Sequence, residues 1–127
     1  MFEKEQDLKK ELYGIICYTK LKGGEYKKLG RNDVDYKLLD KQGNIRGYAE
    51  VKVAEASIAS CFPLNVPVRM VLKLIDKRLN PVIIWSCRDG IVYGIPQELT
   101  GEVKWSKELD DLEIKYNNKK QFKYVRF

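Results

Sequence analysis

Polar and apolar residues alternate in two short runs near the middle of the chain, within residues 35–52. The first run contains two leucines, and the second contains a tyrosine, an alanine and a valine, with Val53 directly after the stretch. The four residues 41–44 between them are Lys-Gln-Gly-Asn, and the glycine can adopt the positive φ of a tight turn. The pattern predicts a β-hairpin, with Glu50 and Lys52 on one face of its second strand and Val51 on the other.

Residues 2–19 carry apolar side chains at every third or fourth position, which is typical of a helix with one buried face. The expected buried stripe consists of Leu8, Leu12, Ile15 and Ile16. Residues 20–31 contain three glycines and five basic residues, so we expect a loop there. Small residues and two prolines favour an irregular connection over residues 54–67. Its aromatic residue, Phe62, is expected in the core, with stacking on a base as the alternative.

The second half of the chain predicts another helix and several strands. Residues 68–79 form the helix, and residues 82–87 are almost continuously apolar, as in a buried strand. A further strand follows at residues 91–95, and alternation at residues 112–116 and 122–127 predicts a C-terminal β-hairpin. The expected buried stripe of the helix consists of Val68, Val71, Leu72, Ile75 and Leu79. These elements indicate one α/β domain spanning residues 1–127.

The register of the central hairpin decides whether Asp35 joins Glu50. If the loop consists of Gln42 and Gly43 alone, Asp35 lies directly opposite Glu50, and the two carboxylates share a face with Lys52. A three-residue loop with a bulge at the glycine moves Asp35 to the other face, unless a second bulge intervenes. The sequence permits both registers.

Two facing carboxylates repel each other, and a divalent cation removes that conflict. Mg²⁺ takes oxygen ligands from one or two carboxylates and keeps water molecules for chemistry. A lysine beside such a site can orient or deprotonate the attacking water, or neutralise charge on a phosphoryl group. The candidate catalytic residues are therefore Asp35, Glu50 and Lys52. The alternative is an ordinary exposed hairpin whose Glu/Lys face is solvated.

The arrangement of Asp35 and, across a hairpin, Glu50-Val51-Lys52 resembles the signature of the PD-(D/E)XK nuclease superfamily. Val34 stands where that signature often has proline. The resemblance covers roughly residues 3–96 and implies a restriction-endonuclease-like core, as in Holliday-junction resolvases, with a central mixed sheet flanked by helices. It implies that Asp35, Glu50 and the Val51 carbonyl bind Mg²⁺, with Mn²⁺ as a substitute. Lys52 then activates or holds the water, and the product carries a 5′-phosphate.

Members of this superfamily often supply another glutamate from the first helix. Glu5 lies on the apolar stripe of the expected helix, one turn before Leu8, so we expect it to take part in the metal site. Glu11 falls on the flank of that stripe and Glu3 points away from it. The alternative for Glu5 is the ordinary preference of acidic residues for a helix N-terminus.

Basic residues outnumber acidic ones, and the formal net charge of +6 favours an anionic partner, which we expect to be DNA. The cations of residues 20–31 lead directly into Asp35, and two more lie near the start of the second helix. Such residues suit phosphate contacts, which give affinity without reading base sequence. The expected DNA-binding residues are Lys20, Lys22, Lys27, Lys28, Arg31, Arg69 and Lys73.

Several function classes are excluded. No histidine occurs, which rules out Ser-His and Cys-His catalysis and histidine-containing metal sites. The three widely spaced cysteines indicate neither a disulfide framework nor a zinc knuckle, so we expect buried thiols in a reducing cytoplasm. The charged N-terminus is unlike a signal peptide, and no apolar run is long enough to span a membrane. A cytoplasmic protein of a cell, phage or virus is expected.

Together these features predict a Mg²⁺-dependent DNA nuclease, preferentially an endonuclease, with a junction resolvase as a variant and a homodimer as one assembly. One competing hypothesis is a non-catalytic nucleic-acid-binding or assembly module that retains the nuclease fold. Another is a metal-independent RNA- or protein-binding domain in which the acidic pair is incidental.

Overall fold

The computed structural model describes residues 5–31 and 33–127, with the side chains of residues 5 and 6 outside the described part. Within it, a mixed sheet in the order β1-β2-β3-β5-β6-β9 is accompanied by a smaller antiparallel sheet, β4-β8-β7. The helices are α1 (Glu5–Lys22) and α2 (Val68–Asp76), and the strands are β1 (Glu25–Lys28), β2 (Tyr36–Leu39), β3 (Ile45–Val53), β4 (Leu64–Pro67), β5 (Pro81–Cys87), β6 (Gly90–Gly94), β7 (Glu102–Ser106), β8 (Asp111–Tyr116) and β9 (Lys123–Arg126).

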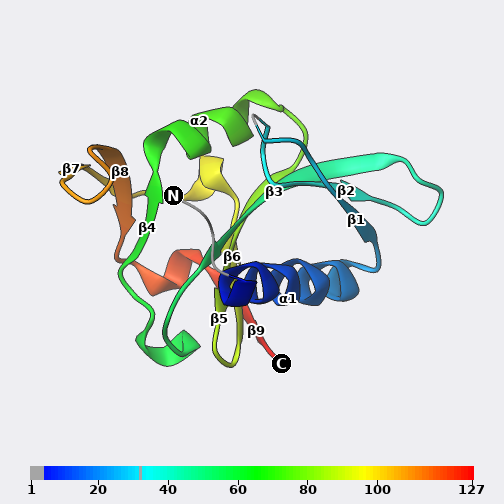
Figure 1. Ribbon diagram of the computed structural model, residues 1–127, viewed down its shortest axis with the longest axis horizontal. Coiled ribbons are helices and arrows are strands. Elements are labelled where there is room, and N and C mark those ends of the chain that lie inside the picture. The colour runs from blue at the N-terminus through cyan, green and yellow to red at the C-terminus, as the bar shows by residue number, and fades with distance from the viewer. Residues whose placement is uncertain (1–4, 32) are drawn as a thin grey trace.

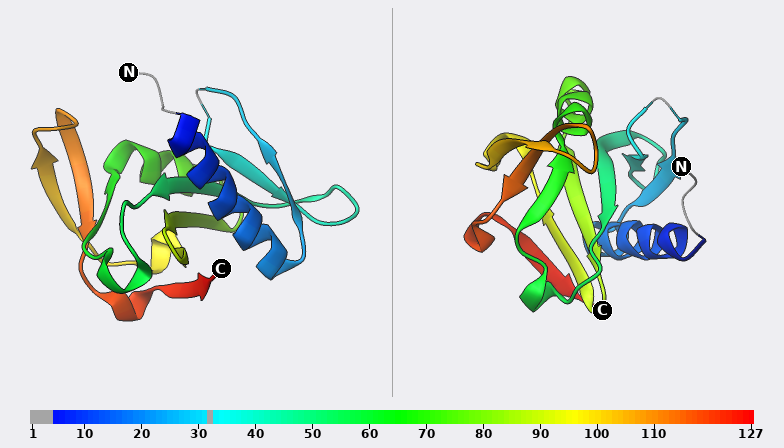
Figure 2. Two further views of the ribbon diagram at one scale, coloured as in Figure 1. Left: turned by 60° about the horizontal axis from the view of Figure 1, so that its bottom comes forward. Right: turned by 60° about the vertical axis from the view of Figure 1, so that its left-hand side comes forward.

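The helices lie on opposite faces of the large sheet (Figure 1 and Figure 2). One core forms between α1 and the sheet around Ile15, Ile84 and Ile91. A second core forms on the other face, where α2 and the small sheet pack around Leu74 and Trp85. The α/β class, the mixed sheet and the order of helix, hairpin, helix and buried strand are therefore confirmed. No helix in the described ranges is long and apolar enough to cross a bilayer.

The first helix ends at Lys22, later than its periodicity suggests, and the predicted loop over residues 20–31 is wrong for residues 20–28, which hold the helix end and β1. α1 ends in a pair of glycines: Gly23 has φ 73°, its N–H donates to the Lys20 carbonyl, and the Gly24 N–H donates to the Thr19 carbonyl. This arrangement is a Schellman motif, which satisfies the last helical carbonyls. The chain then continues as β1, because Tyr26 packs edge-on against Tyr36 of β2, 5.6 Å between ring centroids.

The rotation of α1 also differs from the expectation. Leu8 and Leu12 of the predicted buried stripe are 47% and 40% exposed. The buried face instead contains Glu11, Gly14 and Ile15. A Cβ at Gly14 would lie 3.0 Å from the Ser86 Cβ, so glycine lets the helix backbone approach β5 closely. Close backbone packing at this point sets the rotation, and the two leucines remain partly in solvent.

The β2–β3 hairpin places Asp35 beside Glu50 although its loop has three residues and not two. The loop has three residues, because Asp40 N–H donates to the Asn44 carbonyl and Gly43 has φ 84°. That turn alone would place Asp35 on the wrong face. A second irregularity follows, since Leu39 pairs with Ile45 while Leu38 pairs with Gly47. The extra residue, Arg46, is held by an ion pair with Asp40, 2.9 Å between Nη2 and Oδ2.

The second helix is shorter than expected, since α2 ends at Asp76. Arg78 and Asn80 adopt positive φ values of 59° and 40°, which stop the helix and turn the chain into β5. Leu72 and Leu79 of the predicted stripe are 61% and 38% exposed. Leu74, outside that stripe, is fully buried.

The predicted C-terminal hairpin is wrong. β8 pairs with β4 and β7 in the small sheet, whereas β9 pairs with β6 at the edge of the large sheet. Phe122 causes the crossing, because its ring packs among those of Phe62, Trp85 and Tyr116 at 5.3–5.7 Å between centroids. Phe62 therefore lies in the core, as preferred over the stacking role.

Candidate active site

Asp35 and Glu50 are brought together where β2 begins beside the middle of β3. The Asp35 N–H donates to Glu50 Oε1 at 3.1 Å, and the Val51 N–H donates to Asp35 Oδ2 at 2.9 Å. Each carboxylate is thus oriented by the backbone of the other's segment. Both line one cavity of about 310 Å³ between the hairpin and α2. The shared face that the sequence permitted is confirmed.

The carboxyl group of Glu50 is in an unfavourable place for a charge. The residue is 3% exposed. Burial, and next the negative charge of Asp35, raises its pKa to about 8, while the nearby Lys52 ammonium lowers it by a smaller amount. A buried carboxylate beside another carboxylate costs folding free energy, which a purely structural sheet has no reason to retain.

Three cations line the same cavity: Arg31, Arg69 and Lys73. They were predicted to lie near the carboxylates, and the structure places them there. Arg69 is also within 3.8 Å of Asp111 in β8. Asp33, another residue of the cavity, is paired with Lys77, and that hydrogen bond holds the pKa of Asp33 below its usual value. The cavity therefore combines the carboxylates with three cationic side chains, which suits a phosphate group beside a metal ion.

Glu11, from the middle of α1, extends the acidic pair on the other side. It is 4% exposed, and its Oε1 accepts hydrogen bonds from the Tyr36 hydroxyl at 2.9 Å and from Lys28 Nζ at 2.8 Å. The same Nζ lies 3.6 Å from Asp35 Oδ1. Glu11, which the predicted helix rotation placed on the flank, is thus the described helix carboxylate that reaches the site. The side chain of Glu5, predicted for this role, lies outside the described residues.

A sequence signal for Glu11 exists in retrospect. Gly14 lies one turn after it, and a glycine inside a helix often marks a close backbone approach. The face that carries the glycine is therefore the packed face, and Glu11 lies on it. No comparable local signal points to the bridging position of Lys28, which depends on the pairing of β1 with β2.

Lys52 is only a neighbour of the carboxylate cavity. It is partly buried, and it lines a separate cavity of about 300 Å³ together with Asn65 and Trp85. Strand alternation places it on the same face of β3 as Glu50. Its charge reaches Glu50, since it lowers the pKa of that carboxyl group.

The donor set fits a hard divalent cation. Two carboxylates meet in one cavity, and burial and then the charge of Asp35 raise the pKa of Glu50, so a cation bound between them would stabilise the charged form. The Val51 carbonyl faces the same edge, because the N–H and C=O of one strand residue point to the same side and the Val51 N–H bonds to Asp35. In the described ranges, no group of three or more Asp, Glu, Cys or His side chains has a metal-binding arrangement. Two carboxylates and a carbonyl are sufficient for Mg²⁺.

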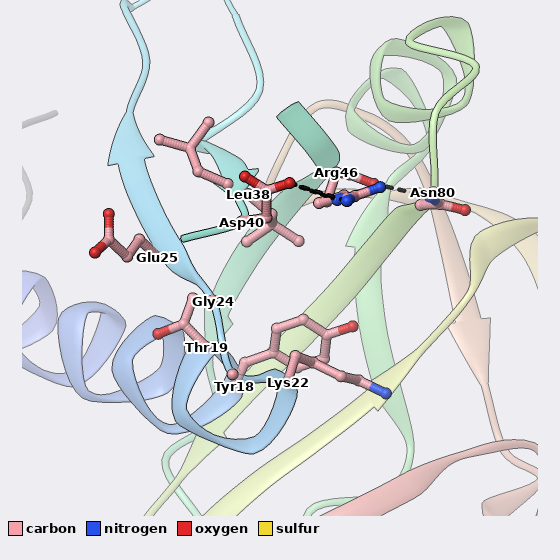
Figure 3. Close-up of a pocket in the computed structure, with 11 residues that line it drawn as sticks. Tyr18, Thr19, Lys22, Gly24, Glu25, Leu38, Asp40, Arg46 and Asn80 are labelled. Carbon is pink, nitrogen blue, oxygen red and sulfur yellow. Dashed lines mark hydrogen bonds and ion pairs between the residues drawn. The ribbon is translucent and has the colours of Figure 1, made fainter. Parts of the chain in front are cut away.

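The remaining predicted DNA-binding residues lie elsewhere. Lys20 lines an apolar groove between α1 and the C-terminal end of the chain at β9. Lys22 lies at a cleft of about 360 Å³ between the end of α1 and the hairpin, lined also by Tyr18 and Leu38 (Figure 3). The Asp40–Arg46 ion pair and Asn80, which bonds to the Arg46 carbonyl, form the opposite wall. Lys27 is exposed on β1. None of these three lines the carboxylate cavity: Lys20 and Lys22 lie at other pockets, whereas Lys27 pairs with Lys37, two residues from Asp35.

Comparisons with models of known protein families, with curated proteins and with solved structures found no match to this chain.

Proposed function

We propose that the protein is a metal-dependent DNA nuclease of the PD-(D/E)XK type that does not recognise a particular base sequence. The observation that carries this proposal is the pair formed by the buried Glu50 and the partly buried Asp35, which shares one cavity with three cations. A restriction-endonuclease-like fold is part of the proposal. It is supported by the order helix, antiparallel hairpin, helix and a strand parallel to β3.

The residues of this cavity and the neighbouring Lys52 have different roles in hydrolysis. Asp35, Glu50 and the Val51 carbonyl hold Mg²⁺, which acts as a Lewis acid on the phosphodiester when bound. Arg31, Arg69 and Lys73 bind the phosphate oxygens and stabilise the extra charge of the transition state. Lys52, from the adjacent cavity, donates a hydrogen bond that orients the attacking water, and the proton of this water passes to solvent. The water oxygen forms a bond to phosphorus, the bond from phosphorus to the 3′ oxygen breaks, and this oxygen takes a proton from solvent, which leaves a 3′-hydroxyl and a 5′-phosphate.

A second function is favoured by the position of Lys52. Because Lys52 lines a different cavity from the two carboxylates, a non-catalytic nucleic-acid-binding module is the alternative.

The decisive assay incubates the purified protein with supercoiled plasmid and with branched DNA in Mg²⁺, in Mn²⁺ and in EDTA. Cleavage that requires the metal and leaves 5′-phosphate ends supports the nuclease. DNA binding without cleavage under every condition would support the module instead.

The cations of the cavity are expected to dominate DNA binding. In Arg31→Gln/Arg69→Gln/Lys73→Gln we expect weaker binding at every sequence and a smaller slope of log affinity against log salt. Each lost phosphate contact reduces the slope by roughly 0.9, so three contacts reduce it by about 2 to 3. Fluorescence anisotropy with a labelled duplex at several salt concentrations measures both quantities.

The matched control is Lys20→Gln/Lys22→Gln/Lys27→Gln, which removes the same charge from exposed residues outside the cavity. Its salt slope should stay close to that of the wild type. Equal losses in the two triple variants would mean that only net charge matters, and that the cavity is not the DNA-binding site.

A further inference from the structure

The ammonium group of Lys28 lies within a charged cluster of which the proposed hydrolysis uses only Asp35. Nζ is 2.8 Å from Glu11 Oε1 and 3.6 Å from Asp35 Oδ1. It also lies 4.7 Å from the centroid of the Tyr36 ring, whose hydroxyl donates to the same Glu11 oxygen. Side chains from α1, β1 and β2 therefore converge on one point beside the carboxylate cavity.

The charges and hydrogen bonds of this cluster compensate the burial of the Glu11 carboxylate. Glu11 is almost fully buried, and a buried carboxylate is tolerated when a cation and a hydrogen-bond donor satisfy it. Lys28 supplies the cation and Tyr36 the donor. Burial, together with the Glu11 charge, raises the pKa of the Tyr36 hydroxyl, so this group remains a donor. The lysine stem is flexible and its side chain is 53% exposed, so the ammonium has room to move.

We propose that Lys28 is a positioning residue that holds Glu11 and Asp35 together in the metal-free protein and competes with a divalent cation for Asp35. The inference rests on the proposed metal site at Asp35 and Glu50. An ammonium group close to that site repels a divalent cation, so Lys28 lowers the affinity of the site for metal. When metal binds, Lys28 keeps its contact with Glu11 and withdraws from Asp35.

Calorimetric titration with Mn²⁺ tests this inference without any cleavage assay. Lys28→Gln removes the competing charge, and we expect it to bind Mn²⁺ about tenfold more tightly than the wild type. Lys28→Arg keeps the charge and forms stronger paired contacts with carboxylates, so it should bind no more tightly than the wild type. Lys27→Gln is the matched control, because it removes the same charge from the adjacent, exposed residue of β1.

The outcomes separate this inference from the proposed function. Unchanged or weaker Mn²⁺ binding in Lys28→Gln, with binding in the wild type intact, would overturn the role of Lys28 alone. If the wild type bound no Mn²⁺, or if Glu50→Gln left its Mn²⁺ binding unchanged, the metal site would be wrong and this inference with it. In protein that already carries Asp35→Asn, adding Lys28→Gln should no longer increase the affinity for Mn²⁺. If Lys28→Gln failed to fold, Lys28→Arg would decide, since tighter binding there contradicts the proposal.

Discussion

Glu50→Gln is expected to abolish metal-dependent cleavage and, at the same time, to raise the free energy of unfolding at neutral pH. The carboxyl group is buried beside Asp35, so its charged form is costly, and an amide of the same shape removes that cost. The amide oxygen can still accept the hydrogen bond from the Asp35 N–H. We expect a gain on the order of 2 kcal/mol near pH 7.5. The lost ligand removes Mg²⁺ and with it the activity.

The pH dependence of this gain follows from the direction of the shift. The pKa of Glu50 is about 8 in the folded protein against an ordinary 4.5, so between these values the folded state binds a proton that the unfolded state lacks. Stability from this group is therefore present at low pH and is lost as the pH rises through that window. The difference between Glu50→Gln and the wild type should be near zero below pH 4.5, rise with pH, and reach its full value above about pH 8.

Denaturant unfolding at several pH values, with and without Mg²⁺, measures both effects. Saturating Mg²⁺ should stabilise the wild type, by roughly 2.7 kcal/mol at one hundred times the dissociation constant, and leave Glu50→Gln unchanged. Glu98→Gln, at an exposed carboxylate outside the cavity, is the control and should change neither quantity. A destabilised Glu50→Gln at pH 8 would show that the carboxylate is structural, and would remove the main support for a metal site.

Lys52→Ala is expected to reduce the cleavage rate by about 10²–10⁴-fold while leaving Mn²⁺ affinity nearly unchanged. Lys52 carries a cation and cannot be a metal ligand, so its contribution must act on the water or the phosphate. It is partly buried beside Trp85, and loss of its aliphatic stem costs some packing. Lys52→Met keeps that stem and is therefore the cleaner variant. Single-turnover cleavage and calorimetric metal titration of both variants give the two quantities.

The control for Lys52 is Lys115→Ala, at another partly buried strand lysine that lies in the small sheet. It should cut at the wild-type rate. If Lys52→Met also cut at that rate, the assignment of the reaction to this face of β3 would be wrong. If every variant, including the wild type, bound DNA and cut none, the non-catalytic module would replace the nuclease.

The local sequence determined the chemistry of the candidate site and most of its elements. The period of two around Glu50 places it on one strand face with Lys52, and this holds whatever the rest of the chain does. The continuous apolar run of β5 predicted a strand buried on both faces, and each of its residues is buried. Arg69 and Lys73 lie one turn apart on α2, which sufficed to place both in the cavity.

The tertiary structure decided the features that depend on two distant segments. Asp35 faces Glu50 because a three-residue turn and a bulge at Arg46 cancel each other, and no local pattern distinguishes that pair from a single two-residue turn. α1 turns Glu11 toward the site instead of burying Leu8 and Leu12, because the contact of Gly14 with β5 sets its rotation. Periodicity gives the spacing of a helix face, whereas the choice of the buried face depends on the closeness of backbone packing.

The C-terminal strands follow the same rule. β8 and β9 alternate as the strands of a hairpin would, yet they belong to different sheets, because Phe122 between them packs into the core beside Trp85. Alternation along a strand reports which side chains are buried together, and it carries no information on the partner strand. Hydrogen bonding between strands is the same for any partner, so the pairing was settled by where the large aromatic rings find room.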